Sequence, residues 1–402
     1  MDKKKSCGNK KQYLKNLRLI NQRANVDPEI IDLIEAYARL RLDYDKEICF
    51  YSNKTSSDKL ELNKMLAKNR HLDPRCLFFL KAYFIAMKNK GLTCLINSAH
   101  LAHLLNVSID HLIWLSNDKS NQYTRFHIKK SSGAKREILA PKPKLKIVQR
   151  QILDNILQKI QLNSHAEGFR KKRSILTNAK RHIGKKVVIK MDVKNFFPSI
   201  TFKRVLGLFI ALGYPHQVSM TLTKLMTHDG KLPTGAPTSP AISNILSTKL
   251  DKRFANLGEK TDFDYSRYAD DISISSNNRN ITRMIPFFKK IVQEEGFEIN
   301  EAKMRILRNG GRQKIAGIVV NQKLNIEKRE IKKIRAVLFN CRNKDINQEI
   351  KKWAQKEKGL KASLFYTIDE FKSSMLGKIN FIKMVNPQTG QNLLDQLNDL
   401  NA

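Results

Sequence analysis

The chain has 402 residues, with 75 Lys or Arg against 37 Asp or Glu, which gives a formal net charge of +38. This length can bury a full core and form two or three subdomains, so a small disulfide-stapled scaffold is excluded. A charge excess of this size favours a polyanionic partner, although a basic surface kept for solubility is the alternative.

Cysteine usage and hydropathy argue against a secreted or membrane protein. The five cysteines are scattered, with no C-x-x-C pair, which is typical of reduced thiols and not of a disulfide framework or a zinc site. The basic N-terminus is not followed by the apolar region of a secretion signal, and no stretch approaches 18 uncharged apolar residues. We therefore expect a cytoplasmic protein without a membrane span.

Residues 1 to about 117 carry helical patterns. Asp27-Pro28 and Asp73-Pro74 are typical helix starts, each followed by apolar residues at helical spacing. Residues 98–116 predict two short helices around Asn106-Val107. A helix-turn-helix DNA reader is one interpretation of this pair, and a packed helical hairpin is the favoured one.

A basic segment follows. Its two strand-like runs, FHIKK and KREILAP, are separated by a Gly-containing turn and predict a β-hairpin, and the apolar stripe at 145–156 predicts a helix. Residues 119–190 hold 20 Lys or Arg against three acids, Glu137, Asp154 and Glu167. Such a stretch would suit a nucleic-acid track.

Two segments near the middle of the chain place acids at the ends of predicted strands. Residues 186–191 form an almost unbroken apolar run, which predicts a buried strand ending at Asp192. Residues 264–275 predict a hairpin whose tight turn carries Asp270 and Asp271. If the hairpin lies beside the strand, the three carboxylates converge within a few ångströms. Either fragment alone would more often indicate turn chemistry or a surface acid.

Three carboxylates in one place predict a metal site. Each like-charged pair at about 4 Å costs roughly 1 to 4 kcal/mol, and a hard divalent cation such as Mg²⁺ relieves that cost. Two such ions about 3.5 to 4 Å apart would activate an attacking hydroxyl and stabilise the leaving oxygen of a phosphoryl displacement. The chemistry indicated is nucleotidyl transfer with two Mg²⁺ ions.

Residues 325–402 return to a helical pattern. Ile331, Ile334, Val337 and Leu338 form one apolar face among basic residues. A small basic helical domain after a sheet is what a grip on template and primer would need, and a helical tail that covers the sheet edge is the alternative.

Taken in order, these segments resemble a reverse transcriptase, and among reverse transcriptases the bacterial retron enzymes. The resemblance spans roughly residues 98–390. NAKRH at 178–182 fits the N-A-x-x-H pattern typical of retrons. The other matching motifs run from the fingers to the strands beyond the palm: KREILAPKPKLKIVQRQIL, HAEGFRKKRSI, VIKMDVKNFFPSI, LPTGAPTSPAISN, YADD, GFEINEAKMR and KIAGIVVNQ.

The resemblance implies roles for individual residues. Asp192, Asp270 and Asp271, with the Val193 carbonyl, would bind the two Mg²⁺ ions. Lys303 would protonate the leaving pyrophosphate, and its alternative is an ordinary surface lysine. The residues expected to contact the incoming nucleotide are the triphosphate-gripping Lys130 and Arg136, the aromatic gate Phe197, and Gly235, Ala236 and Pro237 of a close-approach loop. Core packing is the alternative for one member of the Phe196-Phe197 pair.

In retrons the region around the N-A-x-x-H pattern is thought to help recognise a structured RNA. The residues that this implies as RNA-binding are Arg170, Lys171, Lys172, Arg173, Asn178 and His182. A purely structural use of Asn178 and His182 is the alternative. The chain departs from the family at Thr234, where Gln is usual, and at Ala316, where a threonine is common.

The predicted fold class is α+β, a right-hand polymerase with a helical N-terminal extension: residues 1–117 form that extension, 118–324 the fingers and palm, and 325–402 a helical thumb. The expected function is RNA-directed DNA synthesis from dNTPs, with a cognate noncoding RNA as template. The resemblance to retrons further implies priming from a 2′-OH, a branched RNA-DNA product, a role in phage defence and a separate effector protein.

Two alternatives stay open. One is another bacterial reverse transcriptase, such as an intron-encoded maturase or a diversity-generating enzyme, although we see no C-terminal Cys/His cluster and little sequence beyond the thumb. The other is a non-catalytic RNA-binding protein on the same fold, against which the three crowded acids argue.

Overall fold

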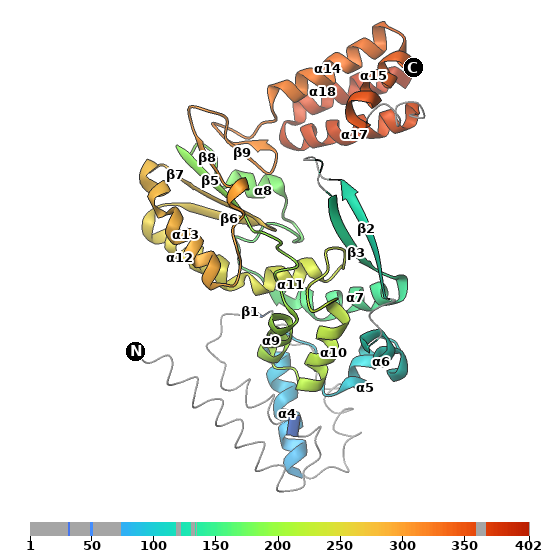
Figure 1. Cartoon of the computed structure of the whole chain (residues 1–402), viewed down its shortest axis with the longest axis vertical. Helices are drawn as coiled ribbons and strands as arrows, with labels where there is room; N and C mark the ends of the chain where they lie inside the picture. Colours follow the sequence, from blue (N-terminus) through green and yellow to red (C-terminus); the bar gives the residue numbers. More distant parts are fainter. Residues whose placement is uncertain are drawn as a thin grey trace. The chain divides into compact units, whose positions relative to one another are not determined.

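The computed structural model describes residues 31–32, 49–50, 74–117, 122–129, 133, 135–358 and 367–401 (Figure 1). The chain divides into two compact units. The first contains residues 1–164, 193–253 and 291–298, and the second contains residues 165–192, 254–290 and 299–402. Each unit is therefore built from separate stretches of sequence, and the division into three consecutive parts stays a prediction.

The first unit is mainly helical. Its helices are α4 (Pro74–Asn89), α5 (Ser98–Leu104), α6 (Ile109–Asn117), α7 (Pro143–Asn155), η1 (Leu157–Lys159), α9 (Phe202–Leu212), α10 (His216–Met226) and α11 (Ser239–Leu246). Its strands form two antiparallel pairs, β1 (Cys49–Phe50) with β4 (Ile160–Gln161), and β2 (Tyr123–Lys129) with β3 (Lys135–Pro141).

Several expected elements of this unit are confirmed. The helix after Asp73-Pro74 begins at Pro74, and the 98–117 segment forms two helices, the second with the Ser108 hydroxyl accepting from the His111 backbone N–H at 3.2 Å. The basic hairpin and the helix after it are also present. The helix expected after Asp27-Pro28 lies mostly outside the described residues, of which 31–32 are helical.

The second unit is built on a four-stranded antiparallel sheet in the order β6-β7-β5-β8. The strands are β5 (Val187–Asp192), β6 (Asp264–Tyr268), β7 (Asp271–Ser276) and β8 (Arg305–Arg308). Smaller elements around the sheet are α8 (Ile175–Lys180), η2 (Arg279–Met284), η3 (Glu301–Lys303), β9 (Lys314–Ile315) and β10 (Ile318–Val319). Two helices, α12 (Thr248–Thr261) and α13 (Ile285–Glu294), begin in one unit and end in the other.

Strand β5 lies inside this sheet, and its composition follows from that position. Val187, Val188 and Ile189 are each at most 1% exposed. On one side Val188 packs with Ala179 of α8. Beyond β7, Tyr265 of β6 stacks on Phe254 of α12 with ring centroids 4.8 Å apart. A strand covered on both faces needs a continuous run of apolar residues. Apolar and polar residues alternate only in a strand that has one face exposed to solvent.

The C-terminal part of the second unit is a helical bundle of α14 (Lys328–Asn343), α15 (Ile346–Lys358), α17 (Ile368–Val385) and α18 (Pro387–Asn398), followed by η4 (Asp399–Asn401). The apolar face expected on α14 is confirmed, with Ile334 and Leu338 buried in the bundle core. Helices α17 and α18 pack closely at Gly390, where a Cβ would lie 2.4 Å from the Lys383 Cβ. No helix in the described part of the chain is long and apolar enough to cross a membrane.

Candidate active site

The carboxylates predicted to share a site lie at one end of the four-stranded sheet β6-β7-β5-β8, which stands where the predicted polymerase fold has its palm and is called the palm sheet below. Asp192 is the last residue of β5 and pairs in register with Asp271, the first residue of β7. Asp270 lies in the turn before it, next to Ala269. The expectation that one tight turn carries both acids is therefore half right, because Asp271 already belongs to the strand and pairs with Tyr268.

The electrostatics of these acids differ from those of surface carboxylates. Burial raises the pKa of Asp270 above its usual value, and the charges of Asp271 and Asp192 raise it further. Burial also raises the pKa of Asp271; there Lys190 opposes the shift and Asp192 adds to it. Asp192 itself is 9% exposed. Burial and like charge both favour the neutral form of these two carboxyls, which nearby positive charge opposes.

Lys303 supplies part of that charge. Its ammonium Nζ lies 2.9 Å from both carboxylate oxygens of Asp192. The short helix η3 is tied to the same strand end, since the Asn300 backbone N–H donates to the Asp192 carbonyl at 2.8 Å and the Lys303 N–H donates to the Asn300 carbonyl. The N-x-x-K motif thus brings the Lys303 ammonium into contact with the Asp192 carboxylate, although the two residues are 111 positions apart in the sequence.

These residues fit a metal in their chemistry but not in their present placement. Among the described residues, no three His, Cys, Asp or Glu side chains lie close enough together to hold an ion as they stand. The donor set nevertheless fits a hard cation in its chemistry, because its oxygens are carboxylates, and the pKa values of Asp270 and Asp271 are raised first by burial and then by neighbouring negative charge. Val193, which follows Asp192 and is 2% exposed, would offer a backbone carbonyl.

The predicted nucleotide loop packs against the basic hairpin. Gly235 has no room for a side chain, since a Cβ there would lie 2.6 Å from the Leu139 carbonyl oxygen. Beside it, the Thr234 hydroxyl donates to the Glu137 carbonyl at 3.0 Å and accepts from the Leu139 N–H at 3.4 Å. The unusual threonine therefore pins the loop to strand β3, a role that the sequence did not indicate.

The other predicted nucleotide contacts differ in exposure. Arg136 lies exposed on β3, directly opposite Ile128, while Lys130 falls outside the described residues. Ala236 is buried and Pro237 half-buried. Phe196 is the member of the aromatic pair that belongs to the core, 5% exposed and 5.6 Å from the Phe297 ring, whereas Phe197 stays half-buried.

Comparisons with known proteins identify the family. The family described as Reverse transcriptase (RNA-dependent DNA polymerase) matches residues 128–323. The chain is 33% identical over 351 residues to the retron Mx162 reverse transcriptase of Myxococcus xanthus, covering 78% of this chain and 68% of that protein. It is 32% identical over 273 residues to the retron Ec86 reverse transcriptase of Escherichia coli, covering 66% and 85%.

The chain belongs to the retron reverse transcriptases. This family places it among the RNA-directed DNA polymerases and confirms the right-hand polymerase fold expected from the motifs. A third relative, the retron Mx65 reverse transcriptase of Myxococcus xanthus, is 35% identical over 296 residues, and the match covers 69% of this chain and 64% of that protein.

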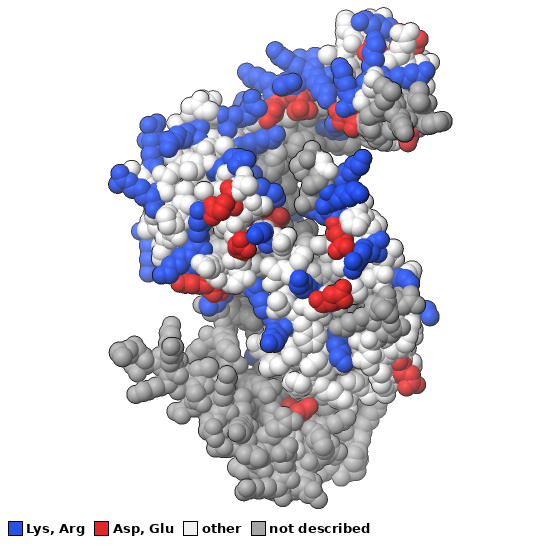
Figure 2. All heavy atoms as spheres, in the orientation of Figure 1, with Lys and Arg blue, Asp and Glu red and all other residues white. Residues whose placement is uncertain are grey.

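The retron-typical segment around α8 contains the residues expected to bind RNA. Lys171, Lys172 and Arg173 are exposed, as Lys and Arg are over much of the face in Figure 2. Asn178 and His182 are not, being 1% and 0% exposed. Both polar groups face the sheet and not solvent, which favours the structural use of Asn178 and His182 over direct contact with RNA.

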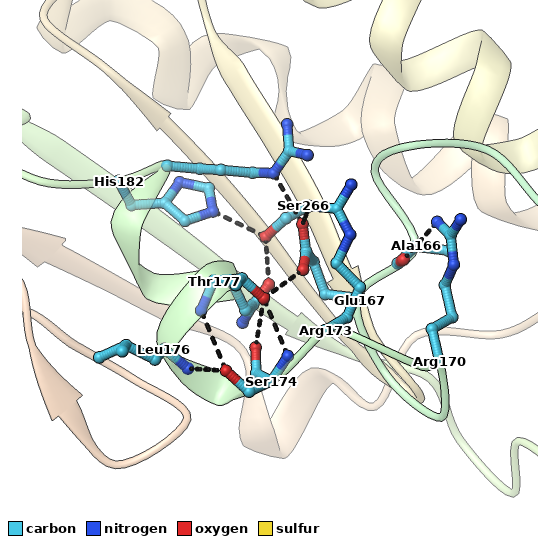
Figure 3. A network of polar contacts seen from close by, with 11 residues as sticks. Ala166, Glu167, Arg170, Arg173, Ser174, Leu176, Thr177, His182 and Ser266 are labelled. Carbon is cyan, nitrogen blue, oxygen red and sulfur yellow. Dashed lines mark hydrogen bonds and ion pairs between the residues drawn. The ribbon is translucent and has the colours of Figure 1, made fainter. Parts of the chain in front are cut away.

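Sequence reasoning also missed the residues that hold this segment. Glu167 is buried, and its carboxylate accepts from the Thr177 hydroxyl at 2.6 Å and from the Arg181 Nε at 3.0 Å (Figure 3). One signal could have found it: Glu167 is one of three acids in the strongly basic stretch 119–190. Ser266 and Ser275, the partners of His182, carry no comparable sequence signal.

Proposed function

We propose that this chain copies a cognate structured noncoding RNA into single-stranded DNA from dNTPs. The observation that carries the proposal is the cluster of Asp192, Asp270 and Asp271 at one end of the palm sheet, with Lys303 paired to Asp192. By its family the product would be branched, primed from a 2′-OH of the RNA, and the system would act in phage defence with a separate effector protein.

The cluster supports catalysis over an idle RNA-binding role. Half-buried acids with raised pKa values destabilise a folded protein near neutral pH, since each would be more easily ionised in the unfolded chain. Perturbed carboxyls of this kind concentrate at functional sites. A protein that used the fold only to bind RNA would gain stability by losing them.

The proposed roles follow from chemistry. Asp192, Asp270, Asp271 and the Val193 carbonyl would hold two Mg²⁺ ions, which when bound supply activation of the attacking hydroxyl and charge neutralisation at the leaving oxygen. Lys303 would hold a proton at Nζ and give it to the leaving pyrophosphate.

The remaining proposed contacts are with nucleotide and RNA. Arg136, with Lys130, would bind the triphosphate, and Phe197 would exclude a ribose 2′-OH. Gly235, Ala236 and Pro237 would lie close to the incoming nucleotide, because small residues permit close approach. The basic cluster Arg170 to Arg173, in which Lys171, Lys172 and Arg173 are exposed and Arg170 is half-buried, would bind phosphates of the cognate RNA.

The test is synthesis by the full chain expressed with its neighbouring noncoding RNA and supplied with dNTPs and Mg²⁺. Wild type should yield RNase-resistant DNA, and Asp270→Asn/Asp271→Asn should yield none. Asp262→Asn is the matched control, because Asp262 is exposed just before the other end of the same hairpin and its left-handed φ of 54° suits Asn. Equal product from the wild type and the double variant would refute the proposal.

A further inference from the structure

The segment from His165 to His182 lies along the edge strand of the palm sheet. The Arg267 backbone N–H of β6 donates to the His165 carbonyl at 2.9 Å, and the Glu167 N–H donates to the Arg267 carbonyl at 2.8 Å. Ala166 thereby forms an isolated parallel bridge with Arg267 of β6. The segment that carries the basic cluster is therefore bonded to the hairpin of Asp270 and Asp271.

The contact reaches the turn before Asp270. A Cβ on Gly168 would lie 2.6 Å from the Ala269 backbone N and 3.2 Å from the Tyr268 carbonyl carbon, so the two backbones touch. Ala269 has a left-handed φ of 56°, and its carbonyl accepts from the buried guanidinium of Arg267 at 3.1 Å. The turn before Asp270 is thus contacted by the Gly168 backbone and hydrogen-bonded by the Arg267 guanidinium of β6.

Behind the hairpin, Asn178 and His182 close a chain of hydrogen bonds. The His182 Nε2 lies 2.7 Å from the Ser266 hydroxyl of β6, and its Nδ1 lies 2.7 Å from the Ser275 hydroxyl of β7. The Ser266 hydroxyl donates in turn to the Asn178 side-chain oxygen at 2.6 Å. The imidazole therefore bridges β6 and β7, the two strands joined by the turn that carries Asp270.

The direction of each hydrogen bond in this network follows from its last acceptor, the Asn178 side-chain oxygen. Since the Ser266 proton goes to Asn178, the Ser266 oxygen must accept from His182 Nε2–H. Nδ1 then carries a lone pair and accepts from the Ser275 hydroxyl. Burial lowers the pKa of His182 to about 4, so the ring is neutral near pH 7 and can donate at one nitrogen while accepting at the other.

Glu167 binds α8, the helix that contains Asn178 and is followed by His182. Its carboxylate binds Thr177 and Arg181, on either side of Asn178, and lies 3.5 Å from the Arg173 guanidinium (Figure 3). The same glutamate is bonded through its backbone to β6. Helix α8 is therefore fixed to the hairpin at both its start and its end.

We propose that Asn178 and His182 are positioning residues for DNA synthesis, which hold the hairpin of Asp270 and Asp271 through Ser266 and Ser275. This inference rests on the proposed function. Because both side chains are buried, they act through the strands that they contact and offer almost no exposed surface to RNA. The retron-typical pattern then serves the polymerase site itself, while the exposed lysines beside it remain available to phosphates.

The test separates positioning from RNA recognition by using a template that the enzyme has no reason to recognise. Full-length wild type and variants extend oligo(dT) on poly(rA), and kcat is measured apart from the KM values for template-primer and dTTP. Because a misplacement of ~1 Å can cost on the order of 100-fold in rate, His182→Leu should lower kcat about 10- to 100-fold with both KM values little changed.

His182→Gln should recover most of the lost kcat, because its amide carries one donor and one acceptor, as the neutral ring does. Lys180→Ala, an exposed change on the same helix, is the matched control and should behave as wild type. Should His182→Leu fail to fold, Ser266→Ala, which deletes a single oxygen from the chain, should still lower kcat.

Two results would overturn the inference. One is wild-type kcat on poly(rA) for Ser266→Ala and for a folded His182→Leu. The other is a loss confined to binding of the cognate RNA, which would assign these residues to RNA recognition. If the wild type itself makes no DNA on either template, the proposed function fails, and the inference falls with it.

Discussion

Glu167→Gln tests the anchor of the segment that lies along the palm sheet. The side chain of Glu167 is fully buried and keeps its size in the variant, so no cavity forms. What changes is charge: the carboxylate accepts from Arg181 at 3.0 Å, from Arg173 at 3.5 Å and from the Thr177 hydroxyl at 2.6 Å. The amide can keep the contact with Thr177, but it bonds the two guanidinium groups only as a neutral acceptor.

The expected loss follows from these contacts. A hydrogen bond to a charged group contributes about 1.5 to 3 kcal/mol, against about 0.5 to 1.5 for a neutral one, so each arginine contact weakens by about 1 kcal/mol. The longer contact to Arg173 contributes less to stability than the contact to Arg181. Solvent screening reduces both contributions, because the side chains of Arg181 and Arg173 are 28% and 34% exposed. We expect a loss of about 1 to 2 kcal/mol.

Thermal unfolding followed by circular dichroism measures this loss. For a unit of this size, about 1 to 2 kcal/mol corresponds to a Tm lower by about 2 to 8 °C. Glu298→Gln is the control, because Glu298 also accepts from an amine, Lys194 at 3.0 Å, but its side chain is 71% exposed, so the change should stay within about 0.5 kcal/mol. A Tm for Glu167→Gln equal to that of wild type would refute the reasoning.

Three further predictions concern the proposed site. Phe197→Ala should admit ribonucleotides more readily in primer extension, and an unchanged preference for dNTPs would remove its gate role. Because the pKa values of Asp270 and Asp271 are raised in the folded protein, the stability they contribute is complete below the ordinary carboxyl pKa and is lost as pH rises through the raised values. Urea unfolding of the metal-free protein should therefore show stability falling across that window in wild type more steeply than in Asp270→Asn/Asp271→Asn, and equal slopes would contradict the shifts. Lys303→Met should lower kcat by about 10² to 10⁴-fold without weakening template binding, whereas wild-type kcat would show that the lysine serves only to pair with Asp192.

Much of the fold was predictable because its signals are local. The apolar run before Asp192 predicts a strand covered on both faces, and β5 is such a strand. Proline after Asp73 predicts the start of α4, and the helical spacing of Ile334 and Leu338 predicts the buried face of α14. Neighbouring residues suffice for these predictions, since backbone preference and side-chain period act within one element.

Predictions about single side chains were less secure, since exposure depends on what packs over a residue. Phe196 and Phe197 are adjacent and chemically identical, yet only Phe196 packs into the core, against Phe297. Thr234 differs from the usual glutamine of the family, and only its two bonds to β3 give the substitution a structural purpose.

The sequence by itself determined the acids, the order of the motifs and hence the family, because these depend on residue identity along the chain. The tertiary structure alone decided what each motif residue contacts. It pairs Lys303 with Asp192, and it places His182 against Ser266 and Ser275, which are 84 and 93 residues distant in the sequence. The physical reason is that such contacts are determined by strand register and by which helix covers the sheet, and neither leaves a periodic signal in the sequence.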